Sequence, residues 1–478
     1  MTLPEGKAVN PKGGIILTYV NYQNRAAVAE NSDVLVCGAG PAGIAAAIAS
    51  SRLGAKTVLL ERFGYVGGNA TAGLVGPFMT SFSLDGESQI IKGIFDELVT
   101  AMEAAGGALH PAKVRAGSPY AGYYVAGHDH VTPFDPEVFK FVAMEMLEQA
   151  GVKTYLHTFV LDALAENGRV AGVVAAGKAG LQAFRAKITV DCTADGDVAA
   201  KSGVEMRQGR DADGLTQPMT LFFRVGNVDD ASIDRYVRDH PQERGMLFSS
   251  LVEQARADGD FPIPRNKVGM YLTTQPGVWR VNTTRLLKYD ATDNADLTKA
   301  EIEGRRQVAA LMKFFRAYLP GFEQAVLVDT AAMVGVRESR RIVGRYVLTL
   351  DDLIAGRHFA DVVALCSYPV DIHSPTGSDG GMRHDIKTAD VYELPYGILV
   401  PEKVDGLLVA GRCVSASHEA LGAIRIMPPA FATGQAAGTA AALCARGGCE
   451  PRSVDVGRLQ GELLRQNVLL TRETGGNA

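Results

Sequence analysis

Three side chains toward the end of the chain, His373, His418 and Arg425, have the chemistry for proton transfer or anion binding. A neutral imidazole, with an ordinary pKa of about 6.5, can accept the proton of an alcohol or amine as the adjacent C–H bond is oxidised. His373 lies between Asp371 and Pro375 in a loop-like stretch typical of site residues, so we expect it to be the base. His418 is the rival, and either histidine could instead be a hydrogen-bonded structural residue. Asp371 is too close in sequence to be assumed as the partner that orients His373.

Arg425 stands alone between two uncharged stretches, 421–424 and 426–445. A charge in such surroundings needs a partner when it is buried. Two interpretations remain open: Arg425 anchors a cofactor carbonyl or a substrate anion, or it forms an ion pair with Glu419.

A glycine-rich turn at 38–43, between apolar stretches 34–37 and 57–60, predicts the first βαβ unit of a dinucleotide-binding fold. Gly38 permits the tight turn, Gly40 lets the backbone approach a pyrophosphate, and Gly43 lets helix and strand pack closely. Pro41 suits the first helical turn, whose free N–H groups and dipole attract phosphate. Glu61 follows the second strand, where its carboxylate can accept hydrogen bonds from ribose hydroxyls.

The composition gives no electrostatic reason to expect a nucleic acid or an anionic membrane as partner. The 478 residues are 47% hydrophobic and carry a formal net charge of −5. Two uncharged runs are rich in alanine and glycine and contain proline, which suits helices packed on a sheet rather than in lipid. Six scattered cysteines without a Cys-x-x-Cys pair, and no basic-then-apolar leader, lead us to expect a cytoplasmic protein.

Two further groups of side chains resemble an anion site and a metal site, but the sequence favours a simpler interpretation of each. Four arginines are interrupted by Glu338, and this pattern favours a solvated or salt-bridged face over an anion site. His128 and His130 form a His-x-His pair that could bind metal on a strand, but no third ligand is evident nearby, so we expect no metal site. The four arginines are Arg337, Arg340, Arg341 and Arg345.

The remaining pattern predicts a mixture of helices and strands. Asp135-Pro136 is typical of a helix start, and Asn167-Gly168 predicts a hairpin between strands at 159–164 and 170–174. Strand-like stretches follow at 187–190, 219–225, 278–282 and 407–410, and helical ones at 297–318 and from about 428.

These segments together resemble the FAD-dependent oxidoreductase family with a cofactor domain of the glutathione-reductase and fumarate-reductase type. The resemblance covers most of the chain from Asp33 to about Ala445. It rests on ordered motifs at 36–43, 190–197, 335–341, 371–373, 408–413 and 434–438.

The resemblance implies that FAD is held by turns from both ends of the chain. The strand at 407–410 would join the one at 34–37, and Gly411-Arg412 would lie at the phosphate and ribityl region. The helix beginning near Pro429 would direct its N-terminus at the flavin pyrimidine ring. The implied cofactor-binding residues are Gly38, Gly40, Pro41, Ala42, Gly43, Glu61, Arg62, Gly67, Gly68, Asn69, Val160, Ala194, Asp195, Gly411, Arg412 and Gly434.

The expected fold class is α/β, a Rossmann-like FAD-binding domain assembled from N- and C-terminal segments with an inserted α+β substrate domain. The FAD-binding domain would comprise 1–75, 131–215 and 385–478. The substrate domain would comprise 76–130 and 216–384.

The expected activity is a dehydrogenase or oxidase that transfers a hydride from a small polar organic molecule to FAD, with oxygen or a redox partner as the final acceptor. Two alternatives remain open. A flavin monooxygenase would need NAD(P)H to reduce the flavin. A non-catalytic carrier of the same fold could lose the phosphate loop, Glu61 and the Gly-Arg turn, so their presence in this sequence speaks against a carrier. The sequence identifies neither the substrate nor the oligomeric state.

Overall fold

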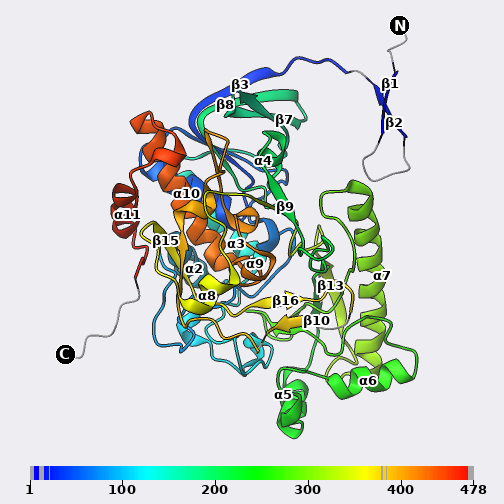
Figure 1. Ribbon diagram of the computed structural model, residues 1–478. Coiled ribbons are helices and arrows are strands. Elements are labelled where there is room, and N and C mark those ends of the chain that lie inside the picture. Colours follow the sequence, from blue (N-terminus) through cyan, green and yellow to red (C-terminus); the bar gives the residue numbers. More distant parts are fainter. Residues whose placement is uncertain (1–4, 10–15, 21, 378–379, 384, 472–478) are drawn as a thin grey trace, which may run out of the picture.

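The computed structural model describes residues 5–9, 16–20, 22–377, 380–383 and 385–471. Its main sheet has the strand order β5-β4-β3-β8-β7-β6, and a seventh strand, β19, pairs with β8 (Figure 1). Strands β3, β4, β5, β8 and β19 are parallel, whereas β7 and β6 are antiparallel additions. The bounds are β3 Ala27–Cys37, β4 Thr57–Leu60, β5 Lys153–Tyr155, β6 Phe159–Glu166, β7 Arg169–Gly177, β8 Gly180–Asp191 and β19 Leu407–Val409.

The predicted assembly of this sheet from both ends of the chain is therefore observed, with one correction. β19 lies beside β8 and not beside β3, because β8 occupies the position next to β3 over nearly its whole length. The hairpin between β6 and β7 turns at Asn167 and Gly168, both with positive φ, as its sequence predicts.

The helices that cover the sheet begin where the sequence places their N-terminal signals. Helix α1, Pro41–Arg52, follows the first glycine turn, and the side chain of Asp135 caps α3, Pro136–Gln149. Helix α2 spans Ile94–Ala104, and α10, Met427–Gly447, crosses the centre of the molecule (Figure 1).

Helices α1 and α10 approach each other closely through glycine. A Cβ atom on Gly434 would lie 2.1 Å from the Ala42 carbonyl oxygen, and one on Gly438 would lie 2.1 Å from that of Ala46. No side chain fits at either position. The N-terminal and C-terminal segments can therefore share one core.

A second, antiparallel sheet has the order β11-β12-β10-β13. It packs with the long helix α7 and the shorter α5 and α6 in a separate apolar core. The predicted strand at 219–225 is regular only from Phe223, because Met219 and Thr220 make isolated bridges to other segments. The bounds are β10 Phe223–Gly226, β11 Met270–Leu272, β12 Trp279–Val281, β13 Val326–Thr330, α5 Asp230–Asp239, α6 Ser249–Ala257 and α7 Asn294–Tyr318.

Short elements connect the two sheets. The pair β16 and β17 lies beside helix α9 and carries Asp371 and His373. The remaining elements are β1 Glu5–Val9, β2 Ile16–Val20, β9 Met206–Gln208, β14 Arg340–Ile342, β15 Val362–Cys366, β16 Asp371–His373, β17 Gly380–Met382, β18 Tyr392–Pro395, α4 Asp197–Lys201, α8 Leu350–Ala355, α9 His418–Ile424 and α11 Val456–Arg465.

The two main apolar cores divide the chain differently from the predicted domain boundaries. Ile94, Phe95 and Leu98 of α2, like the strand β15, belong to the core of the main sheet. The segments 76–130 and 216–384, predicted as the substrate domain, thus contribute to both cores. Among the described residues, no helix is both long and apolar enough to cross a membrane.

The contact between α1 and α10 can be tested with Gly434→Ala. The added methyl group meets backbone, which cannot rotate away, so we expect the free energy of unfolding to fall by about 1–3 kcal/mol in urea titrations. Gly447→Ala, on the same helix, is the control, because the nearest atom to its Cβ is Cys449 Sγ at 3.9 Å. Equal loss of stability in both variants would contradict the packing argument.

Candidate active site

A cavity of about 650 Å³ opens at the carboxyl ends of the parallel strands, between the turn at Gly38 and the turn at Gly411. Most of the residues predicted to hold a cofactor line it. The lining includes Gly38, Gly40, Pro41, Ala42, Glu61, Arg62, Gly68, Asn69, Val160, Ala194, Asp195, Gly411 and Arg412.

Gly43, Gly67 and Gly434 lie outside this lining, and the structure gives each a role in packing or backbone conformation. A Cβ on Gly43 would lie 1.8 Å from the Gly38 carbonyl oxygen, so this glycine keeps the turn and α1 in contact. Gly67 has a φ of 118°, in the left-handed region that favours glycine. Gly434 faces α1 and not the cavity.

Glu61 connects the glycine turn to the end of β4. Its Oε2 accepts a hydrogen bond from the Ala39 N–H at 2.8 Å, and its Oε1 accepts one from the Phe63 N–H at 3.0 Å. The side chain is buried, and burial raises the pKa of its carboxyl. Each carboxylate oxygen has a further lone pair that can accept from a ligand at the cavity surface.

The second turn of the cavity, after β8, is held by the buried carboxylate of Asp191. This side chain accepts hydrogen bonds from the Thr193 and Ala199 N–H groups. The turn presents Asp195, whose Oδ1 lies 2.7 Å from the Arg412 guanidinium. Arg412 thus reaches the cavity already paired with a carboxylate, which lessens the positive charge it offers to a phosphate.

A second cavity of about 510 Å³ adjoins the first. Its walls come from the second sheet, from β16 and from the loop before α3. The residues that line both cavities are Asn69, Val336, Arg412, Arg425 and Met427. A molecule in one cavity would therefore meet a molecule in the other at this border.

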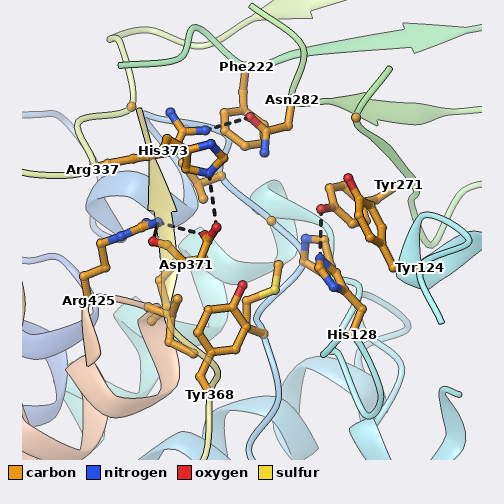
Figure 2. Close-up of a pocket in the computed structure, with 18 of the residues that line it drawn as sticks. Tyr124, His128, Phe222, Tyr271, Asn282, Arg337, Tyr368, Asp371, His373 and Arg425 are labelled. Atoms are coloured by element: carbon orange, nitrogen blue, oxygen red, sulfur yellow. Dashed lines mark hydrogen bonds and ion pairs between the residues drawn. The ribbon is translucent and has the colours of Figure 1, made fainter. Parts of the chain in front are cut away.

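His373, Asp371 and Arg425 form a chain of polar contacts at that border (Figure 2). His373 Nε2 lies 3.4 Å from Asp371 Oδ1, and Asp371 Oδ2 accepts a hydrogen bond from Arg425 Nη2 at 2.8 Å. Arg425 therefore pairs with Asp371 and not with Glu419, the partner that sequence proximity suggested. Asp371 also contacts His373, because both project from one face of β16.

Burial sets the charge state of His373. It lowers the pKa of the imidazole to about 3, with a further contribution from the Arg337 charge, and the opposite pull of Asp371 does not restore it. The ring is therefore neutral at physiological pH. Its Nδ1 is buried and has no hydrogen-bond partner among the described residues.

His418 lies elsewhere. Its Nδ1 is 2.8 Å from Glu338 Oε1, and Glu338 also forms a buried ion pair with Arg341. His418 lines neither cavity. The arginine group of the sequence is likewise divided: Arg340 and Arg341 are paired with acidic residues, whereas Arg337 lines the second cavity.

The wall opposite His373 is aromatic (Figure 2). His128 stacks beside Tyr124 and Tyr271, with ring centroids 4.2 and 6.0 Å from its own, and burial lowers its pKa to about 4. His130 instead stacks on Phe82. Within the described part of the chain, no group of three or more His, Cys, Asp or Glu side chains could hold a metal ion.

Several residues of the second cavity carried no sequence signal of function. Arg265, Tyr271 and Asn282 occur in stretches with no recognisable motif, and Arg337 was attributed to a salt-bridged face. They meet only because the second sheet folds over the first. The isolated charge that the sequence did indicate near this cavity was Arg425, between two uncharged stretches.

The model of a family described as FAD dependent oxidoreductase matches residues 33–463. The chain belongs to this family. The protein is therefore an enzyme, and it uses FAD. An oxidoreductase of this kind requires a substrate and either a redox partner or oxygen.

Single relatives are more distant. A thiamine thiazole synthase from Aeropyrum pernix is 33% identical over 143 residues, which are 30% of this chain and 43% of that protein. Among solved structures, a geranylgeranyl bacteriochlorophyll reductase-like protein from Thermoplasma acidophilum is 13% identical, with a TM-score of 0.43 over 92% of this chain and 84% of that one. A p-nitrophenol 4-monooxygenase from Pseudomonas putida DLL-E4 is 14% identical, with a TM-score of 0.44 over 91% and 85%.

The residues of the first cavity suit FAD. Helix α1 begins at the cavity without a side-chain cap, so its first N–H groups are available to a pyrophosphate. Gly40 leaves open space where a side chain would stand. At the border with the second cavity, the buried Arg425 Nε has no partner among the described residues and can donate to a flavin carbonyl.

Gly40→Val is expected to yield a folded enzyme without flavin. The backbone there, with φ −74° and ψ −173°, accepts any residue, and the nearest atom to a Cβ is Gly68 Cα at 4.0 Å. The valine side chain would enter the space of the cofactor. Absorbance at the flavin bands, with circular dichroism to verify folding, measures the result; full flavin occupancy in a folded variant would contradict the assignment.

Glu61→Ala is expected to weaken FAD binding by about 1.5–3 kcal/mol, the range for hydrogen bonds to a charged group. Reconstitution of apoprotein with FAD measures the dissociation constant. Glu61→Gln is the matched variant, because it preserves the shape of the side chain but loses the charge and one of the two accepting oxygens. If neither variant changes the dissociation constant, Glu61 does not contact the ribose.

Proposed function

We propose that this enzyme oxidises a small polar organic molecule by transferring a hydride to FAD, with His373 as the general base. The observation that carries the proposal is the neutral His373 imidazole, with an unpartnered buried Nδ1, in a cavity that adjoins the cofactor cavity.

The chain supplies a proton acceptor where such an oxidation needs one. When an alcohol or amine carbon loses hydride, its O–H or N–H group loses a proton and a C=O or C=N bond forms. His373 Nδ1 has a lone pair for that proton when Nε2 carries the ring hydrogen and donates toward Asp371. Asp371 also stabilises the imidazolium that results.

Arg425 acts as a positioning residue for this pair. It neutralises Asp371, so the carboxylate persists in a buried site. Bound FAD would supply the hydride acceptor for this oxidation, with oxygen or a redox partner as the final electron acceptor. The N-terminus of α10 reaches the border through Met427, and its dipole favours negative charge there.

His373→Ala is expected to slow anaerobic flavin reduction by about 10²–10⁴-fold, the usual contribution of a general base, while the FAD content stays unchanged. Stopped-flow absorbance with a substrate that bleaches the wild-type flavin measures the rate. Bleaching without NAD(P)H also separates this activity from that of a monooxygenase.

His418→Gln is the matched control, because His418 contacts Glu338 and lines neither cavity. We expect its rate of flavin reduction to stay within a few-fold of wild type. If His418→Gln abolishes reduction and His373→Ala reduces normally, the base is His418.

The pH dependence provides a separate test. A base is inactive when protonated, and His373 in the free enzyme protonates only near its pKa of about 3. We therefore expect no fall of kcat/KM from this residue between pH 8 and pH 5. A loss of kcat/KM with a midpoint near the ordinary histidine value, about 6.5, that disappears in His373→Ala would contradict the lowered pKa of His373.

A further inference from the structure

The second cavity carries an excess of positive charge. Among the described residues that line it, Asp371 is the one carboxylate. Burying cations without anions is unfavourable unless a ligand supplies the opposite charge. The lining cations are Arg244, Arg265, Lys267, Arg337, Arg412 and Arg425.

Two of these cations are already neutralised. Arg412 pairs with Asp195 at 2.7 Å, and Arg425 pairs with Asp371 at 2.8 Å. The other four have no carboxylate within 4.0 Å in the part of the chain that the structure describes.

Arg265, which is buried, and Arg337, which is half-buried, form the inner pair. Both are held by Asn282: Arg265 Nη2 donates to its backbone oxygen at 3.0 Å, and Arg337 Nη2 donates to its Oδ1 at 3.1 Å. The two guanidinium groups are therefore close together. Burial and their mutual repulsion lower the pKa of Arg337, and burial lowers that of Arg265. Arg265 Nε is buried and has no hydrogen-bond partner among the described residues.

The opposite wall consists of aromatic rings, so the cavity offers ring surfaces as well as charge, and Lys267 Nζ lies 4.5 Å from the centre of the Tyr124 ring. Tyr124, His128 and Tyr271 stack on one another, and Phe222 and Tyr368 also line the space (Figure 2). A volume of about 510 Å³ is much larger than a two-carbon acid needs.

We propose that the substrate is a carboxylic acid with a flat, ring-sized body, whose carboxylate binds between Arg265 and Arg337 and whose body lies against the wall of Tyr124 and Tyr271. This inference rests on the proposed function, because it names the substrate class of the same site. A bidentate guanidinium–carboxylate contact satisfies the charge and the unpartnered donor of Arg265 together.

The outer cations, Arg244 and Lys267, fit a second role. Arg244 is exposed and Lys267 is half-buried, so the positive charge extends from the surface to the inner pair. Such a gradient accelerates the arrival of anions, and salt screens it. We expect Arg244→Gln to reduce the association rate and its salt dependence, with little change in the dissociation rate.

Anion binding also improves His373 as a base. Arg337 and Arg265 disfavour the imidazolium, whereas Asp371 favours it, with Arg425 paired to Asp371. A carboxylate between the two arginines offsets their charge, so His373 accepts a proton more readily in the complex than in the free enzyme. The acid limb of kcat should therefore lie at higher pH than that of kcat/KM.

The test uses the FAD-loaded enzyme and non-oxidisable probes. Benzoate, benzamide, cyclohexanecarboxylate and acetate are titrated by calorimetry and by the change in flavin absorbance. We expect benzoate to bind at least tenfold more tightly than neutral benzamide, and more tightly than acetate. Equal affinity for benzoate and benzamide would overturn the charge argument, and equal affinity for benzoate and acetate would overturn the ring-sized body.

Arg265→Gln and Arg337→Gln are expected to weaken benzoate roughly 10- to 100-fold, the loss for a hydrogen bond between charged groups, and to leave benzamide unchanged. Arg306→Gln is the matched control, because Arg306 is exposed on α7. If Arg337→Gln fails to fold, two measurements still test the anion site. They are the benzoate affinity of Arg265→Gln and the competition of chloride with benzoate in the wild type. Unchanged benzoate affinity in a folded Arg265→Gln variant, without chloride competition, would overturn the proposal.

These binding experiments need no turnover. Benzoate binding with normal flavin reduction in His373→Ala would reject the proposed base and keep the anion site. Loss of reduction in His373→Ala without selective benzoate binding would keep the base and reject the anion site.

Discussion

The structure depends on the close approach of α1 and α10, two helices whose sequences are almost four hundred residues apart. Gly434 and Gly438 allow the carbonyl oxygens of Ala42 and Ala46 to occupy the space where side chains would stand. This contact brings the glycine turn after β3 and the N-terminus of α10 to the same cavity. Larger side chains at these positions would separate the two sides of this cavity, so steric exclusion determines its geometry.

The second constraint is electrostatic. Asp371 is a half-buried carboxylate among several cations, and it both neutralises Arg425 and contacts His373. The surrounding positive charge and the His373 contact hold the pKa of its carboxyl well below the ordinary range, although burial opposes this. Asp371 thus stays ionised and balances the charge of Arg425. The positive charge of Arg265 and Arg337 has no such partner among the described residues, and we infer that it makes the cavity selective for an anion.

Desolvation connects these two constraints. The same burial that packs the helices removes water from His373 and His128 and lowers the pKa of both imidazoles. Two neutral histidines therefore face one cavity from opposite walls (Figure 2). His373 has a carboxylate beside it and His128 has a tyrosine hydroxyl at 3.3 Å, so the two rings occupy different chemical environments.

The sequence by itself predicted the turn from β3 to α1, the position of Glu61 after β4 and the helix start near Pro428, because these are local signals with local physical causes. It could not assign Gly434, whose role depends on a helix far away in the chain. It also could not pair Arg425 with Asp371, or bring Arg265, Arg337 and Asn282 together. Those contacts join segments with no shared periodicity, and only the folding of the second sheet over the first places their charges within reach of one another.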